Sequence, residues 1–145
     1  MSKVTELLAQ IRESEMKDFY LLSSKKKGAT IFNNFKSYHA NVDKASRCKS
    51  EDVRERYDIQ AEKYFSIASR QLETLNEQEV GDYIHVVLSR LSRAMDNIND
   101  SNWLSTRMLF RTIINKLPQN LTEENRKQLG LLLEMYERFD HELEK

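Results

Sequence analysis

Three histidines are the first candidates for chemistry, and two of them lie one helical turn from a carboxylate. Asp82 precedes His85 by three residues and Glu137 precedes His141 by four, so each pair would share one face of a helix. A di-iron site in a helical bundle requires two Glu-x-x-His motifs and two further inward-facing Glu residues. Neither pair has that form, and helical periodicity puts His85 on the polar side, so we predict no metal site.

The sequence contains no motif that indicates nucleophilic catalysis. The single cysteine, Cys48, falls on the polar side of its predicted helix without a His partner nearby in the sequence, and no Gly-x-Ser-x-Gly elbow occurs. The glycines Gly28, Gly81 and Gly130 are isolated, so no glycine-rich phosphate loop is formed. His39 lies at the edge of an apolar face and is interpreted as a packed histidine. We therefore predict a protein that is not an enzyme and binds no cofactor.

Four arginines and two apolar residues form the strongest candidate for a binding surface. They are Arg90, Arg93, Leu104, Arg107, Met108 and Arg111. Leu104 and Met108 fall on the otherwise polar side of their helix, and exposed apolar residues flanked by Arg are typical of partner-binding patches. The alternative is that other helices of the same chain cover them, since single apolar residues on a surface are common.

A second basic group indicates a possible contact with phosphate. Its members are Lys25, Lys26, Lys27, Lys36, Lys44 and Arg47. The first three belong to Ser23–Gly28, which we predict to break the helical pattern, and the others lie on the outer face of the helix that follows. A run of lysines is a weak signal, because most charge runs are simply solvated.

The candidate partner-binding residues belong to a predicted helical hairpin, residues 80–117, around which the rest of the chain is organised. Apolar residues recur at helical spacing on both sides of the polar turn at 97–102. Asn76 and Glu79 have the spacing of a capping box before the first helix. Pro118 disfavours helical dihedral angles at Leu117 and is expected to end the second helix there.

The whole chain shows the same 3.6-residue periodicity. Helices are predicted at 2–23, 30–48, 51–75, 79–97, 102–117 and 122–144. The third has one apolar face, made up of Val53, Tyr57, Ala61, Tyr64, Ala68, Leu72 and Leu75. Three glycines and one proline leave few tight turns, so the sequence predicts an all-α fold, a single-domain bundle or short stack of about six helices.

Charge is balanced in total but uneven along the chain. The 145 residues contain 23 Lys or Arg and 23 Asp or Glu, which gives no bulk attraction for a polyanion. Residues 25–56 and 83–119 are nevertheless basic, whereas 57–82 and 120–145 are acidic. A single cysteine and the lack of a long apolar run predict an intracellular protein without a membrane span, in the cytoplasm with the nucleus left open.

These observations predict a non-enzymatic protein-binding module or adaptor subunit of a larger assembly, which binds a protein partner through the hairpin 80–117. The alternative is a subunit of a nucleoprotein complex whose cations contact the backbone of RNA or DNA. A third possibility is a homodimer through helix 122–144, where Leu131 and Met135 widen the apolar face.

Overall fold

Five helices make up the described part of the chain. The computed structural model describes residues 22–97, 103–118 and 121–143. The helices are α2 (Leu22–Arg47), α3 (Glu51–Glu73), α4 (Glu77–Asp96), α5 (Trp103–Asn115) and α6 (Glu123–Leu143). These ranges contain no strand, so the all-α prediction is confirmed. The predicted helix 2–23 lies outside the described residues except for its last two positions.

The largest difference from the sequence prediction is at the start of α2. The predicted break at Ser23–Gly28 is wrong: α2 begins at Leu22 and continues through the three lysines, so Lys25, Lys26 and Lys27 lie on a helix and not in a loop. Gly28 has a negative φ and is not a helix breaker here. A Cβ atom at Gly28 would lie 3.0 Å from the Cα atom of Tyr83, so the glycine allows α2 and α4 to approach closely.

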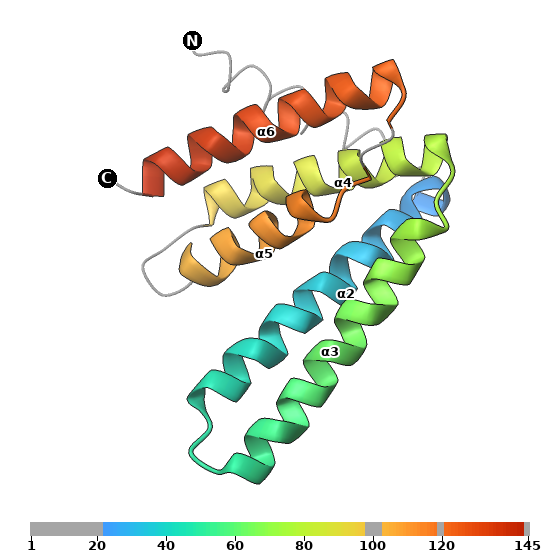
Figure 1. Ribbon diagram of the computed structural model, residues 1–145. Helices are drawn as coiled ribbons and strands as arrows, with labels where there is room; N and C mark the ends of the chain where they lie inside the picture. The colour runs from blue at the N-terminus through green and yellow to red at the C-terminus, as the bar shows by residue number, and fades with distance from the viewer. Residues whose placement is uncertain (1–21, 98–102, 119–120, 144–145) are drawn as a thin grey trace.

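Helix α2 joins two parts of the molecule. It packs antiparallel to α3, and it also contacts α4 and α5, while α6 packs against α4 and α5. Figure 1 shows that the connected ends of α2 and α3 project away from α4, α5 and α6. We call this α2–α3 end, residues 41–62, the projecting hairpin.

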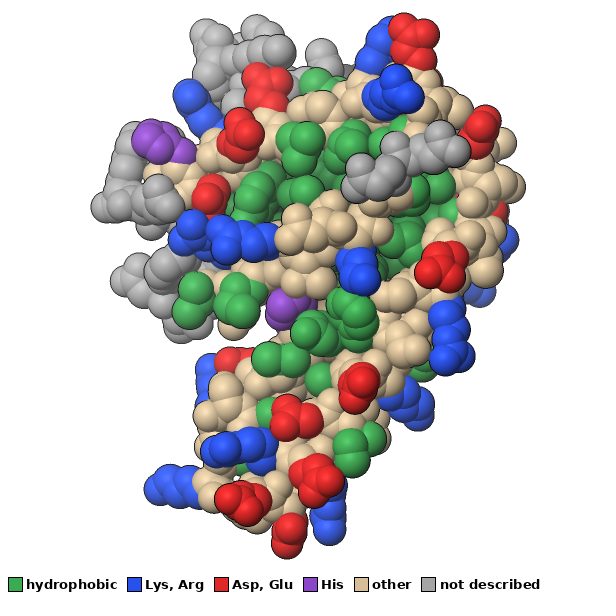
Figure 2. All heavy atoms as spheres, in the orientation of Figure 1, with side chains coloured by type: hydrophobic (Ala, Val, Ile, Leu, Met, Phe, Trp, Pro, Cys, Tyr) green, Lys and Arg blue, Asp and Glu red, His purple; other side chains and the backbone are tan. Residues whose placement is uncertain are grey.

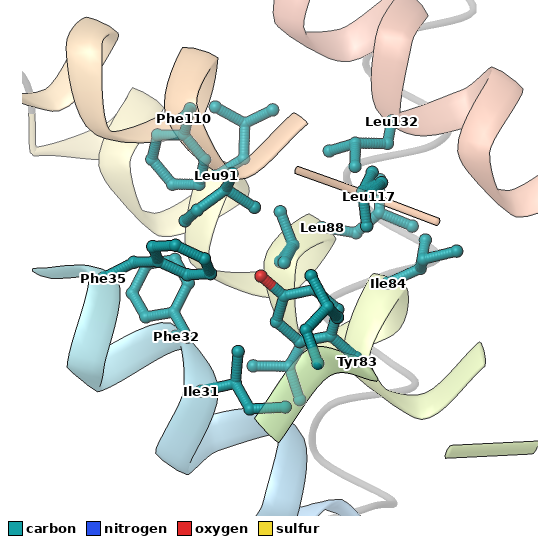
Figure 3. Close-up of a cluster of buried hydrophobic side chains, with 14 of the residues drawn as sticks. Ile31, Phe32, Phe35, Tyr83, Ile84, Leu88, Leu91, Phe110, Leu117 and Leu132 are labelled. Atoms are coloured by element: carbon teal, nitrogen blue, oxygen red, sulfur yellow. The ribbon is translucent and has the colours of Figure 1, made fainter. Parts of the chain in front are cut away.

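The hydrophobic core lies where α2, α4, α5 and α6 meet. Figure 3 shows Phe32 and Phe35 from α2, Leu88 and Leu91 from α4, and Phe110 from α5 pointing toward one another. Helix α4 is the central element, since buried positions surround almost its whole circumference. They are Val80, Tyr83, Ile84, Val86, Val87, Leu88, Ser89, Leu91 and Ser92. Burying one large apolar side chain contributes about 1.5–3 kcal/mol, so α4 dominates the stability of the fold.

Local signals define the start of two helices. Asn76 and Glu79 form the predicted capping box: the Glu79 amide donates to Asn76 Oδ1 at 2.9 Å, and the Asn76 amide donates to Glu79 Oε1 at 3.0 Å. At α6, the Asn125 amide donates to the Thr122 hydroxyl oxygen at 3.2 Å. Helix α5 ends at Asn115, two residues before the predicted boundary at Leu117.

Candidate protein-binding face of α5

Helix α5 has one buried side and one exposed side. Leu109, Phe110 and Ile113 are buried in the core. On the opposite side Leu104 and Met108 are 55% and 46% exposed, followed by the exposed Arg111 and Asn115. The spacing of four, three and four residues places these side chains in one stripe along the helix. We call Leu104, Met108, Arg111 and Asn115 the outer face of α5.

Contacts on both flanks hold α5 in one orientation. Toward α2 and α3, His39 Nε2 lies 2.9 Å from Thr112 Oγ1, and the Lys116 ammonium lies 4.8 Å from the ring centroid of Phe65. Toward α6, Arg107 pairs with Asp140. Because α5 is fixed from two sides, its outer face points into solvent as a preorganised surface. In Figure 2 hydrophobic side chains come to the surface at α5 next to Lys or Arg side chains.

The predicted partner-binding residues divide into four groups in the structure, the last of which is Arg107 beside α6. Leu104, Met108 and Arg111 lie together on the outer face of α5. Arg90 is half-buried, with its guanidinium 5.8 Å from the ring centroid of Phe32 on α2. Arg93 is exposed on α4. The hairpin 80–117 therefore contributes mainly its second helix to a continuous surface.

Arg107 connects α5 to α6. Its Nε atom lies 2.5 Å from Asp140 Oδ1, and Nη2 donates to Oδ2 at 3.3 Å. Both side chains are largely buried, with 20% and 24% of their surface exposed. Separating α5 from α6 would leave both charges without their partner in a poorly solvated place, which is costly. The pair therefore helps to hold α6 beside α5. The Arg107 guanidinium is therefore already paired with a carboxylate of the same chain.

The predicted phosphate-binding cations are dispersed along α2, and several have intramolecular partners. Lys27 Nζ lies 2.5 Å from Glu79 Oε2, and Arg47 Nη2 lies 3.1 Å from Asp43 Oδ2. The hydrogen bond from Lys27, and then that from the Asn76 amide, lowers the pKa of Glu79. The Lys44 ammonium lies 5.8 Å from the ring centroid of Tyr57. Lys26 and Lys36 are exposed, and the side chain of Lys25 lies outside the described residues.

The histidines and the cysteine are not gathered into one site. Burial lowers the pKa of His39, whose ring is also in edge-on contact with Tyr38. His141 and Cys48 lie at the ends of α6 and α2, respectively. Within the described ranges, no group of three or more His, Cys, Asp or Glu residues could hold a metal ion.

Two neighbouring hollows lie near the starts of α4 and α6. One, of about 410 Å³, is lined in part by His85 and Asp82. The other, of about 370 Å³, is lined by apolar residues and by polar ones that include Glu73, Glu77 and Lys116. Both are lined by Asn125, a buried residue whose side-chain amide donates to the Glu77 carbonyl oxygen at 2.8 Å. Because this buried amide is already hydrogen-bonded, it does not require a ligand.

Two features of the α5 surface were missed by reasoning from the sequence. Asn115 belongs to the outer face, and its position seven residues after Met108 was a sufficient signal. The hydrogen bond between His39 and Thr112 joins residues 73 positions apart and had no local signal.

No described helix is long and apolar enough to cross a bilayer. Comparisons with protein-family models, with curated proteins and with solved structures found no match to this chain.

Proposed function

We propose that the chain is a non-enzymatic, intracellular protein-binding module that works as an adaptor or subunit of a larger assembly. The outer face of α5 is its binding surface. The observation that carries the proposal is the exposure of Leu104 and Met108, 55% and 46%, one turn apart on a helix that is otherwise held firmly in the fold. Arg111 beside them supplies a planar, multidentate donor for an acidic group.

Burial of these two side chains would drive the association. Full burial of a Leu or Met side chain contributes about 1.5–3 kcal/mol, and about half of each surface is still available. The pair would therefore contribute roughly 2 kcal/mol, enough for the centre of a small interface whose rim adds specificity. The fixed orientation of α5 keeps the ordering cost of binding low.

Binding to the backbone of RNA or DNA is the alternative function. The exposed Lys26 and Lys36 support it, but the pairs Lys27–Glu79 and Arg47–Asp43 reduce the positive field along α2. Nucleic-acid binding would weaken steeply with salt, by roughly one logarithmic unit of slope per phosphate contacted. A protein interface centred on apolar side chains would be much less sensitive.

A homodimer through α6 is less favoured because the core already uses most of its apolar face. Met135, which widens that face in the sequence, is fully buried, as is Leu132. Leu131 is half-buried and Leu133 is 39% exposed, so the described part of α6 exposes little apolar surface.

The test is affinity capture with the full chain followed by quantitative mass spectrometry. The wild type is compared with Leu104→Asp/Met108→Asp and with Ile59→Asp, a control on α3 whose original side chain is 58% exposed. We expect a set of proteins that the control retains and the α5 variant loses, at low and at physiological salt and after nuclease treatment. If a variant with an intact helical spectrum keeps every partner, the outer face of α5 is not the binding surface. Loss of all partners after nuclease treatment would favour the nucleic-acid alternative.

A further inference from the structure

Helix α5 carries an unbalanced positive charge beside its exposed apolar residues. Its sequence, residues 103–115, contains two arginines and no acidic residue. Two acids on the neighbouring helices already pair with cations of the same chain: Asp140 with Arg107, and Asp43 with Arg47. The exposed Arg111 forms no ion pair or hydrogen bond with the side chains that the structure describes. A partner that covers Leu104 and Met108 would meet this exposed cation.

The shape of the outer face fits a helix. Leu104 and Asn115 are eleven residues apart, which corresponds to a straight stripe of about 16 Å. A partner helix that crosses α5 at a shallow angle would place its apolar residues, spaced three and four positions apart, against Leu104 and Met108. An acidic side chain one turn further along that helix would reach Arg111.

A second copy of α5 is a poor binding partner for the outer face of α5. Antiparallel pairing of two α5 helices about Met108 would bring the two Arg111 positions within about 9 Å along the axis, because each lies three residues from the centre. Neither helix has an acid to neutralise them. Nucleic acid is also disfavoured, since this face offers one cation around an apolar centre.

We propose that the outer face of α5 binds an acidic amphipathic helix of a different protein. This inference rests on the proposed function and specifies the chemistry of its partner. Apolar side chains of the incoming helix would bury Leu104 and Met108, and a carboxylate would accept hydrogen bonds from the Arg111 guanidinium.

The experiment measures fluorescence anisotropy of labelled helical peptides with the full chain. The acidic probe has about 18 residues, enough to run past both ends of the stripe, with Leu at helical spacing and Glu beside it. A second peptide replaces each Glu with Lys, and a third replaces each Leu with Ala. The protein variants are Met108→Asp, Arg111→Glu and the control Ile59→Asp, each checked by circular dichroism.

We expect the wild type and the control to bind only the acidic, Leu-containing peptide. Met108→Asp and Arg111→Glu should each weaken this binding about tenfold, and Arg111→Glu should gain affinity for the Lys peptide. Equal binding of the acidic and basic peptides, or no effect of Arg111→Glu, would overturn the acidic-helix proposal.

The remaining outcomes separate this inference from the proposed function. If no peptide binds but captured proteins still depend on Leu104 and Met108, the face binds protein and the acidic-helix proposal fails alone. If sedimentation shows self-association that Met108→Asp abolishes, a second copy is the occupant and the proposal of a different protein is wrong. If the acidic peptide binds but the wild type and the Leu104→Asp/Met108→Asp variant capture the same proteins, the inferred binding chemistry holds and the adaptor function fails.

Discussion

Helices α3 and α4 have similar lengths, 23 and 20 residues, but very different surroundings. Helix α4 buries nine positions, whereas α3 buries only Ala61, Ala68 and Leu72. Helix α4 is contacted by α2 and α6, while α3 packs mainly on α2 and continues into the projecting hairpin. Apolar burial is therefore concentrated in one half of the molecule, and the projecting hairpin is held by small residues and polar contacts.

The polar contacts of the projecting hairpin are local. Arg54 Nη2 donates to the Cys48 carbonyl oxygen at 2.8 Å, and Lys44 lies over Tyr57. Such exposed contacts contribute little each, so this region should open more readily than the core. The difference indicates that stability resides around α4 and that surface substitutions on α3 are suitable controls.

The largest predicted effect tests this contrast directly. Leu91→Ala, at a fully buried position of α4, should lower the free energy of unfolding by about 3 kcal/mol, because it removes buried methyl groups and leaves a cavity. Ile59→Ala, at a position 58% exposed on α3, should change it by about 0.5 kcal/mol or less. Urea titration followed by circular dichroism measures both. Similar losses for the two variants would show that the projecting hairpin is as tightly coupled as the core.

An intermediate effect is predicted for the two helical glycines. Gly28→Ala should destabilise the fold by about 1 kcal/mol, since the added Cβ would meet the Tyr83 Cα at 3.0 Å and Val86 Cγ2 at 3.3 Å. Gly130→Ala should stabilise it by about 0.5–1 kcal/mol, because the described neighbours leave the Cβ position open and Ala is the better helix former. Thermal unfolding of both variants shows whether each substitution lowers or raises the stability of the fold. A stabilising Gly28→Ala would contradict a tight crossing of α2 and α4.

The smallest effect concerns pH and the contact of α5 with α2. Burial lowers the folded-state pKa of His39, so below about pH 6.5 the unfolded chain takes up a proton more readily than the folded one. The wild type should lose stability as the pH falls from about 6.5 toward the lowered pKa and then level off. His39→Gln, which keeps a side-chain donor for Thr112, should show a shallower decline in urea titrations at several pH values. If stability falls with pH equally in the wild type and in His39→Gln, His39 is not the cause of the pH dependence.

The sequence alone determined the helical class and much of the local detail. Periodicity placed Leu104 and Met108 on the polar side of their helix, next to Arg107 and Arg111. The Asn76–Glu79 spacing identified a capping box that the structure contains. These features depend on residues three or four positions apart, whose relation in a helix is fixed by backbone geometry. The same rule applied to Val53 predicted a buried face, but Val53 is 38% exposed, because among the described helices α3 packs mainly on α2.

Only the tertiary structure decided how these helices use their residues. Arg107 reaches Asp140 across 33 positions, and His39 reaches Thr112 across 73. Gly28 looked like a helix break, yet it is the point where α2 approaches α4. Such pairings depend on the order and crossing of packed helices, which local periodicity does not encode. Tertiary packing therefore engaged Arg107 within the fold and left Arg111 exposed on the outer face of α5.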